Sequence, residues 1–119
     1  MRLSNEEFED VVEDALASIP DGFHRYLEEV AVDIEEMPDP ATCRDLEVSP
    51  RHLLGLYRGT PLTDRHVEAP YRIVIYQRNI ERICRSRQQI LEQIRKTVLH
   101  EVGHHFGLNE AQLRELGYG

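Results

Sequence analysis

Apolar residues near the start of the chain recur every three or four positions, the period of an amphipathic helix. They are Phe8, Val11, Val12, Ala15, Leu16 and Ile19. Ser4 can cap the free amides of the first turn while Glu7 reaches back to it, and Pro20-Asp21-Gly22 ends the pattern. We therefore expect a helix that begins at Ser4, followed by a short helical turn over residues 23–27.

The pattern changes its period at Val30, where apolar and polar residues begin to alternate. Val30, Val32 and Ile34 share one side of this alternation, as in a strand with one buried face. The run Met37-Pro38-Asp39-Pro40 ends it, because proline cannot donate to a sheet ladder. Residues 38–52 form a polar connection that no pattern assigns to a helix or a strand.

Two further strands are predicted at Leu53–Tyr57 and Tyr71–Tyr76, and the second contains the β-branched run Ile73-Val74-Ile75. The segment from Gly59 to Asp64 is rich in turn-forming residues, and it fits either a long hairpin or a loop over a cleft. The sequence from Asn79 to about Arg85 then has the pattern of a short helix.

A long helix is predicted to follow, with Ser86 as its cap and Gln89 as the capping partner. Its apolar side carries Ile90, Ile94, Val98 and Leu99. The helix should stop near Gly107, because glycine adopts the left-handed conformation that closes helices. Asn109 can cap a last short helix, with Gln112 at the position of its partner.

Together these elements predict an α+β fold that forms one domain over residues 1–119. It would have a small mixed sheet of about three strands, an N-terminal helix and a long C-terminal helix. A length of 119 residues suits one hydrophobic core, and 40% hydrophobic with 30% charged residues is typical of a globular protein in water.

The formal net charge of −8 argues against nucleic acid as the main partner, because binding a polyanion requires a concentrated basic surface. The basic stretch from Arg78 to Arg87 is read as a solvated helix face that pairs with acidic residues. Cys43 and Cys84 are expected to be free, buried thiols. No apolar signal segment and no membrane-spanning run is found, so we expect a cytoplasmic protein without a membrane partner.

The chemically most specific feature is the segment His100-Glu101-Val102-Gly103-His104, which fits the pattern H-E-x-x-H. Residues four apart lie on the same face of a helix, so two imidazole nitrogens can converge on one zinc ion. Glu101 follows the first of these ligands. It is expected to accept a proton from a zinc-bound water and so to act as the catalytic base.

A catalytic zinc site typically has three protein ligands, so the chain should supply one more. Glu110 is our choice, because a turn at Gly107 would bring a side chain three residues later back toward the metal. Glu115 is a weaker rival. Histidines elsewhere in the chain could in principle supply the third ligand, but they fall in or near predicted loops or turns, where exposed surface is the default interpretation. They are His24, His52 and His66.

His105 is about 100 degrees around the helix from His104, so it should point away from the metal. We expect it to support the site from behind or to pack in the core rather than to bind zinc. Asp39, Asp45 and Glu47 are expected to be ordinary surface carboxylates.

In these residues the chain resembles the small bacterial zincin-like metallopeptidases, sometimes described as minimal metalloproteases. The resemblance spans nearly the whole chain and is most specific over His100–Leu108. It implies an α+β zincin core with zinc on His100 and His104, Glu101 as general base and an acidic third ligand at Glu110. The chain departs from larger metzincins, whose third ligand is usually histidine, and it has no methionine downstream of the motif.

The leading hypothesis is therefore a zinc-dependent hydrolase of peptide bonds, with a peptide or protein as its partner. The strand at Ile73–Tyr76 could present an edge to which an extended peptide adds. The alternative is a zinc-binding protein-interaction module without turnover, and a third possibility is an amidase of a small metabolite.

Overall fold

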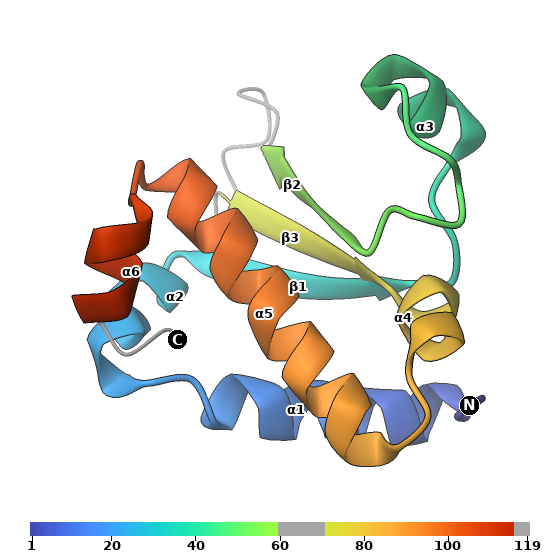
Figure 1. Ribbon diagram of the computed structural model, residues 1–119, viewed down its shortest axis with the longest axis horizontal. Coiled ribbons are helices and arrows are strands. Elements are labelled where there is room, and N and C mark those ends of the chain that lie inside the picture. Colours follow the sequence, from blue (N-terminus) through green and yellow to red (C-terminus); the bar gives the residue numbers. More distant parts are fainter. Residues whose placement is uncertain (60–70, 116–119) are drawn as a thin grey trace.

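The computed structural model describes residues 1–59 and 71–115 of the chain (Figure 1). Its elements are α1 (Asn5–Ala17), the 3-10 turn η1 (Asp21–Phe23), α2 (His24–Leu27), β1 (Val30–Glu35), α3 (Pro40–Leu46), β2 (Gly55–Gly59), β3 (Tyr71–Tyr76), α4 (Gln77–Ile83), α5 (Arg87–His105) and α6 (Glu110–Glu115). Helices and a three-stranded mixed sheet make this an α+β fold, and the predicted N-terminal and long C-terminal helices are both present.

The first helix begins where the sequence predicted. The Ser4 hydroxyl accepts a hydrogen bond from the Glu7 amide at 3.1 Å, and the Glu7 carboxylate accepts one from the Ser4 amide at 3.0 Å. This reciprocal pair satisfies amides that have no partner inside the helix. The apolar stripe of α1 is buried, and it consists of Phe8, Val11, Val12 and Ala15.

The sheet has the strand order β1-β3-β2, with β1 parallel to β3 and β2 antiparallel to it. Ile73 at the centre of β3 lies opposite Val32 of β1 on one side and Tyr57 of β2 on the other. Val30, Val32 and Ile34 pack against the main hydrophobic core, so the predicted core-facing side of β1 is confirmed, whereas residues 30–34 are all half-buried and their exposure does not alternate.

The expectation that Ile73–Tyr76 offers a free edge to a peptide is wrong, because β3 is paired on both sides. All four of these residues are buried, and an apolar run of this kind fits the centre of a sheet better than its edge. The edges are formed by β1 and β2, whose sequences are more polar. A peptide that extends the sheet would therefore have to add to one of those two strands.

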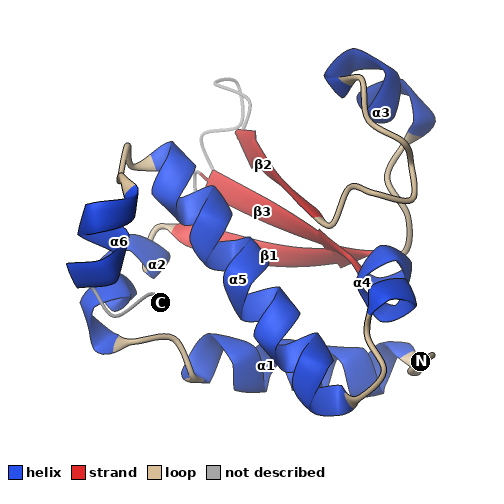
Figure 2. Cartoon of the chain, viewed as in Figure 1, coloured by secondary structure: helices blue, strands red, loops and turns tan. Residues whose placement is uncertain are grey.

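One face of the sheet is covered by α5 and α1, which pack against each other and enclose the main core (Figure 2). Ile73 and Ile75 of the sheet meet Ile90, Ile94 and Val98 of α5 in this core. A methyl group placed on Gly55 would lie 2.5 Å from Cγ2 of Thr97, so β2 and α5 approach each other more closely here than a larger residue permits. This close contact brings the start of β2 against the helix that carries the H-E-x-x-H motif.

A buried polar side chain, Asn79, explains why β2 begins later than predicted. Nδ2 of Asn79 donates to the carbonyls of Pro50 and Leu53, both at 2.7 Å. The Leu53 carbonyl is thus engaged outside the sheet, and β2 begins at Gly55 instead of Leu53. Helix α4 begins at Gln77, two residues before the predicted start.

The N-terminus is attached to α4 through Glu81, which is only 3% exposed. Its carboxylate accepts hydrogen bonds from the Leu3 amide at 2.9 Å, from Gln77 at 3.0 Å and from Arg78 at 2.8 Å. Burial alone would raise the pKa of this carboxyl, but the three hydrogen bonds and the nearby Arg78 charge outweigh it and lower the pKa. Composition and periodicity gave no sign of this network.

Several smaller predictions can be compared with the structure. The polar connection over residues 38–52 contains a helix, α3, and Asp39, Asp45 and Glu47 are exposed as expected. Cys43 and Cys84 are free and buried, as expected. Thr60 to Asp64, in the predicted turn, lie outside the described residues. Among the helices that are described, none is long and apolar enough to span a membrane.

Candidate metal and catalytic site

Helix α5 presents the two histidines of the motif on its exposed side because its other side is fixed in the core. Ser86 caps its start by accepting a hydrogen bond from the Gln89 amide at 3.1 Å, whereas the Gln89 side chain accepts from the Arg85 amide rather than from Ser86. Ile94, Val98 and Val102 are buried, so the residues between them on the other side of the helix face outward. That exposed side carries His100 and His104.

His100 and His104 form an adjacent pair of imidazoles at the C-terminal end of α5. Their ring centroids are 4.3 Å apart, and the rings are tilted by 49° to each other. Both side chains are exposed, so their ring nitrogens are accessible to an ion from solvent. The local prediction that helical spacing would place the two rings side by side is confirmed.

Glu101 lies next to this pair and contacts the sheet. Its Oε2 atom accepts a hydrogen bond from the backbone amide of Tyr57 at 3.2 Å. The Tyr76 amide donates to the Leu54 carbonyl at 3.0 Å, so in this antiparallel pair Leu54 and every second residue after it bond to β3. Gly55 and Tyr57 therefore direct their amides and carbonyls away from β3, and Glu101 is held at the edge of β2 that no other strand of the described residues pairs with.

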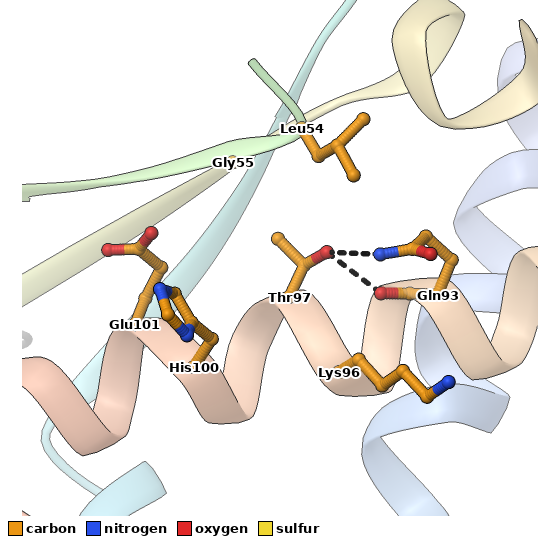
Figure 3. Close-up of a pocket in the computed structure, with 7 residues that line it drawn as sticks. All are labelled: Leu54, Gly55, Gln93, Lys96, Thr97, His100 and Glu101. Atoms are coloured by element: carbon orange, nitrogen blue, oxygen red, sulfur yellow. Dashed lines mark hydrogen bonds between the residues drawn. The ribbon is translucent and has the colours of Figure 1, made fainter. Parts of the chain in front are cut away.

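A cavity of about 320 Å³ opens between this edge and the helix (Figure 3). Its walls come from Leu54 and Gly55 on one side and from α5 on the other. The helix contributes Gln93, Lys96, Thr97, His100 and Glu101. The cavity thus contains one imidazole of the pair, the carboxylate beside it and the start of an unpaired strand edge.

The turn after α5 forms as predicted. Gly107 has a φ of 67°, a left-handed conformation, and the Leu108 amide donates to the Gly103 carbonyl at 2.8 Å. Asn109 and Gln112 then cap α6 reciprocally, with bonds of 2.8 and 2.9 Å. Helix α6 packs across α5 at Gly103, where an added methyl group would lie 3.3 Å from the Leu113 side chain.

Glu110 begins α6 and is exposed. Within residues 1–59 and 71–115, no three His, Cys, Asp or Glu side chains gather into a group that could hold a metal ion. Glu110 as the third ligand is therefore still a prediction. Two imidazoles and a carboxylate are nonetheless the ligand types that zinc takes, so the residues at this end of α5 and α6 fit zinc in their chemistry.

Comparison with known proteins decides the family of the chain. A family model described as zincin-like metallopeptidase matches residues 27–119. The chain belongs to this family. Zinc binding is a general property that the family implies, and the matched region includes all of the candidate site residues.

One solved structure similar to this zincin-like chain is a conserved hypothetical protein from Thermus thermophilus. The identity is 22%, the TM-score is 0.56, and the alignment covers 87% of this chain and 94% of the other. At that identity the likeness concerns the fold alone. Among curated proteins, none matches this sequence.

His105 of the zincin-like chain points toward the sheet, away from the histidine pair. Its ring stacks on Tyr57 with centroids 4.4 Å apart and an angle of 25°, and it contacts Tyr71 at 4.1 Å. Burial and the neighbouring Tyr71 raise the pKa of the Tyr57 hydroxyl. The expectation that His105 packs instead of facing the metal agrees with this arrangement.

The other histidines weighed as ligands are not near the pair in the described structure. His24 and His52 are exposed, and a ring nitrogen of His24 lies 3.1 Å from the Ile19 carbonyl. His66 lies outside the described residues. Sequence reasoning missed Tyr57 and Lys96, because neither belongs to a motif and only the packing of β2 on α5 places them at the site.

Proposed function

We propose that this chain is a zinc-dependent peptidase in which Glu101 acts as general base. One observation carries the proposal: the carboxylate next to the histidine pair is held at the unpaired edge of β2. The carboxylate, one imidazole of the pair and the edge of β2 thus lie beside one cavity, which supports the proposal. Membership of the zincin-like metallopeptidase family supports the same reading.

His100 and His104 would hold the ion, with Glu110 as the third ligand. Zinc, when bound, polarises an amide carbonyl and lowers the pKa of water, which is the chemistry that amide hydrolysis requires. The carboxylate of Glu101 would take a proton from the attacking water and deliver it to the leaving amine. The Tyr57 amide would orient that carboxylate through the hydrogen bond already present.

The substrate would bind as an extended segment along β2. Gly55 and Tyr57 direct their backbone groups away from β3, so a further strand could pair with them, although the Tyr57 amide already donates to Glu101. Such a segment would pass over the cavity and place one amide beside His100 and Glu101. This assigns to β2 the role that sequence reasoning had given to β3.

The decisive experiment compares Glu101→Gln with the wild type after both have been loaded with zinc. We expect the variant to keep its zinc and to lose about 10²- to 10⁴-fold in kcat on a peptide library. Glu92→Gln is a matched control on the same helix outside the cavity, and its turnover should equal that of the wild type. Undiminished hydrolysis by Glu101→Gln would show that the base is another residue.

The second candidate is a zinc-binding interaction module without turnover. It is favoured by the packing of α6 on α5, because a metal held between His100, His104 and Glu110 would join these two helices. Unfolding on chelation, with no hydrolysis of any library peptide, would support this role. A folded metal-free protein that recovers hydrolysis with added zinc would support the peptidase.

A further inference from the structure

Lys96 is the only lysine among the 14 lysine and arginine residues of the chain, and it lies in the wall of the cavity beside the candidate site. It is located on α5 one turn before His100 (Figure 3). The side chain is exposed, and no salt bridge joins it to a carboxylate in the described part of the chain. The cavity thus contains a cation without an acidic partner among the described residues.

Apart from His100, which is assigned to the metal, the other polar side chains of the cavity already have partners among the described residues. The Thr97 hydroxyl donates to the Gln93 carbonyl at 2.8 Å, and the Gln93 side-chain amide donates to that hydroxyl at 3.3 Å. Glu101 accepts from the Tyr57 amide. The Lys96 ammonium is therefore the charged group of this wall that a ligand can still pair with.

The position of Lys96 relative to His100 determines which residue of a bound peptide could pair with the ammonium. Residues four apart on a helix have Cβ atoms about 5–6 Å from each other, and a lysine side chain is long and flexible. An extended peptide advances about 3.3 Å per residue. A group held by Lys96 would thus belong to a residue adjacent, or nearly adjacent, to the amide beside His100.

We propose that this cavity selects substrates with a carboxylate next to the scissile amide, and that Lys96 binds this carboxylate. The inference rests on the proposed peptidase function and adds the substrate class to it. An apolar side chain of the substrate would displace water from the ammonium and offer no hydrogen bond in its place, which costs free energy. A carboxylate would replace that water with a charge-assisted hydrogen bond. The carboxylate can be an Asp or Glu side chain or a free C-terminus.

The chain as a whole has a formal charge of −8 and does not attract acidic peptides at long range. Selection must therefore be local, by a cation in the wall of the cavity. A local ion pair with an exposed ammonium weakens as salt screens it. The preference for acidic substrates should accordingly decrease with ionic strength.

Binding can be tested without turnover by NMR on an inactive variant. The chain has a single lysine, so a lysine label gives a single resonance. The full chain with Glu101→Gln, loaded with zinc and labelled with ¹³C at the lysine ε-carbon, should show one Lys96 resonance. We would titrate it with acetylated and amidated alanine peptides containing Asp or Asn at one position, and with an all-alanine peptide carrying a free or an amidated C-terminus. The first pair tests a side-chain carboxylate and the second a terminal one.

We expect a saturable shift of the Lys96 signal with one acidic member and with neither neutral member. Which acidic peptide produces it identifies the source of the carboxylate. Equal shifts from acidic and neutral peptides, or no shift with any of them at concentrations where binding is detected by another signal, would overturn the role of Lys96.

Kinetics provide the second test. Lys96→Met should lower kcat/KM for the preferred acidic peptide about tenfold and leave the neutral peptide unchanged, and Lys96→Arg should retain the preference. Lys96→Glu should shift the preference toward a basic residue at the same position. Arg95→Met removes a neighbouring charge on α5 outside the cavity, and it should preserve the acidic preference.

The two proposals fail in different ways. Hydrolysis without preference for acidic peptides, and unchanged by Lys96→Met, overturns the substrate class and leaves the peptidase in place. A saturable Lys96 shift without hydrolysis by the wild type overturns the peptidase and supports a site that binds acidic ligands.

Discussion

The backbone amide of Tyr57 and the carboxylate of Glu101 are joined by a hydrogen bond of 3.2 Å that connects the edge of the sheet to helix α5. This amide is also one of the donors that a peptide adding to β2 would use. The proposed base and the proposed peptide-binding edge thus share one donor. Binding of a peptide at Tyr57 and orientation of Glu101 are therefore coupled through a single N–H group.

Replacing Tyr57 with proline removes this donor and should leave the sheet intact. The Tyr57 amide faces away from β3, and proline is tolerated at edge positions where the amide is not in the ladder. We expect kcat/KM to fall by about 10- to 100-fold, the effect of losing a hydrogen bond to a charged group. Tyr57→Ala keeps the amide and loses only the ring, so it is the control. Equal activity of the two variants would contradict a role for the amide.

His105→Ala should separate packing from metal binding. The ring stacks on Tyr57 and contacts Tyr71, and an aromatic pair of this kind contributes about 1 kcal/mol beyond its buried area. For a chain of this size such a loss lowers Tm by about 4 °C. Zinc content, measured by elemental analysis, should stay at the wild-type level, whereas His104→Ala should lose the metal. A zinc-free His105→Ala protein would instead make this residue a ligand.

Glu110→Ala tests the third ligand directly. Mutating a residue that only orients a metal ligand weakens metal binding by up to about a hundredfold. Loss of a ligand itself should therefore weaken zinc binding by more than that. The matched control is Glu115→Ala on the same short helix, which should bind zinc as the wild type does. Elemental analysis of protein purified without an affinity tag gives the stoichiometry. Undiminished zinc in Glu110→Ala would remove this residue from the ligand set.

Gly55→Ala should destabilise the contact between β2 and α5. The added methyl group would lie 2.5 Å from Cγ2 of Thr97, so one element must shift, and overpacking of this kind costs about 1–3 kcal/mol. Thr97→Ser removes that methyl carbon while keeping the hydroxyl. We expect the double variant to be more stable in urea than Gly55→Ala alone. Strictly additive losses in the two variants would show that the contact with Thr97 is not the cause.

The lowered pKa of Glu81 predicts a specific dependence of stability on pH. A carboxyl whose pKa is lower in the folded than in the unfolded chain stabilises the protein above its unfolded pKa of about 4.3. That contribution is lost as the pH falls through the lower folded value. Glu81→Gln should therefore be less stable than the wild type at neutral pH, and the difference in unfolding free energy should shrink below pH 4. A constant difference between neutral and acidic pH would contradict the ionised, hydrogen-bonded state of Glu81.

Local features of this protein could be predicted from the sequence because their causes lie within a few residues. Ser4 with Glu7 and Asn109 with Gln112 cap their helices through neighbouring amides, and Gly107 ends α5 through its own backbone conformation. The two rings of the H-E-x-x-H motif are adjacent because a helix brings every fourth residue to the same face.

Only the tertiary structure decided which parts of the chain meet at that motif. The order of the strands depends on long-range pairing, so it placed the apolar β3 in the centre and left β2, with Tyr57, as the edge beside Glu101. The same packing, permitted by the missing side chain of Gly55, set Lys96 in the wall of the cavity. These relationships join residues some 40 positions apart, and their free energies come from burial and hydrogen bonds that no local pattern contains.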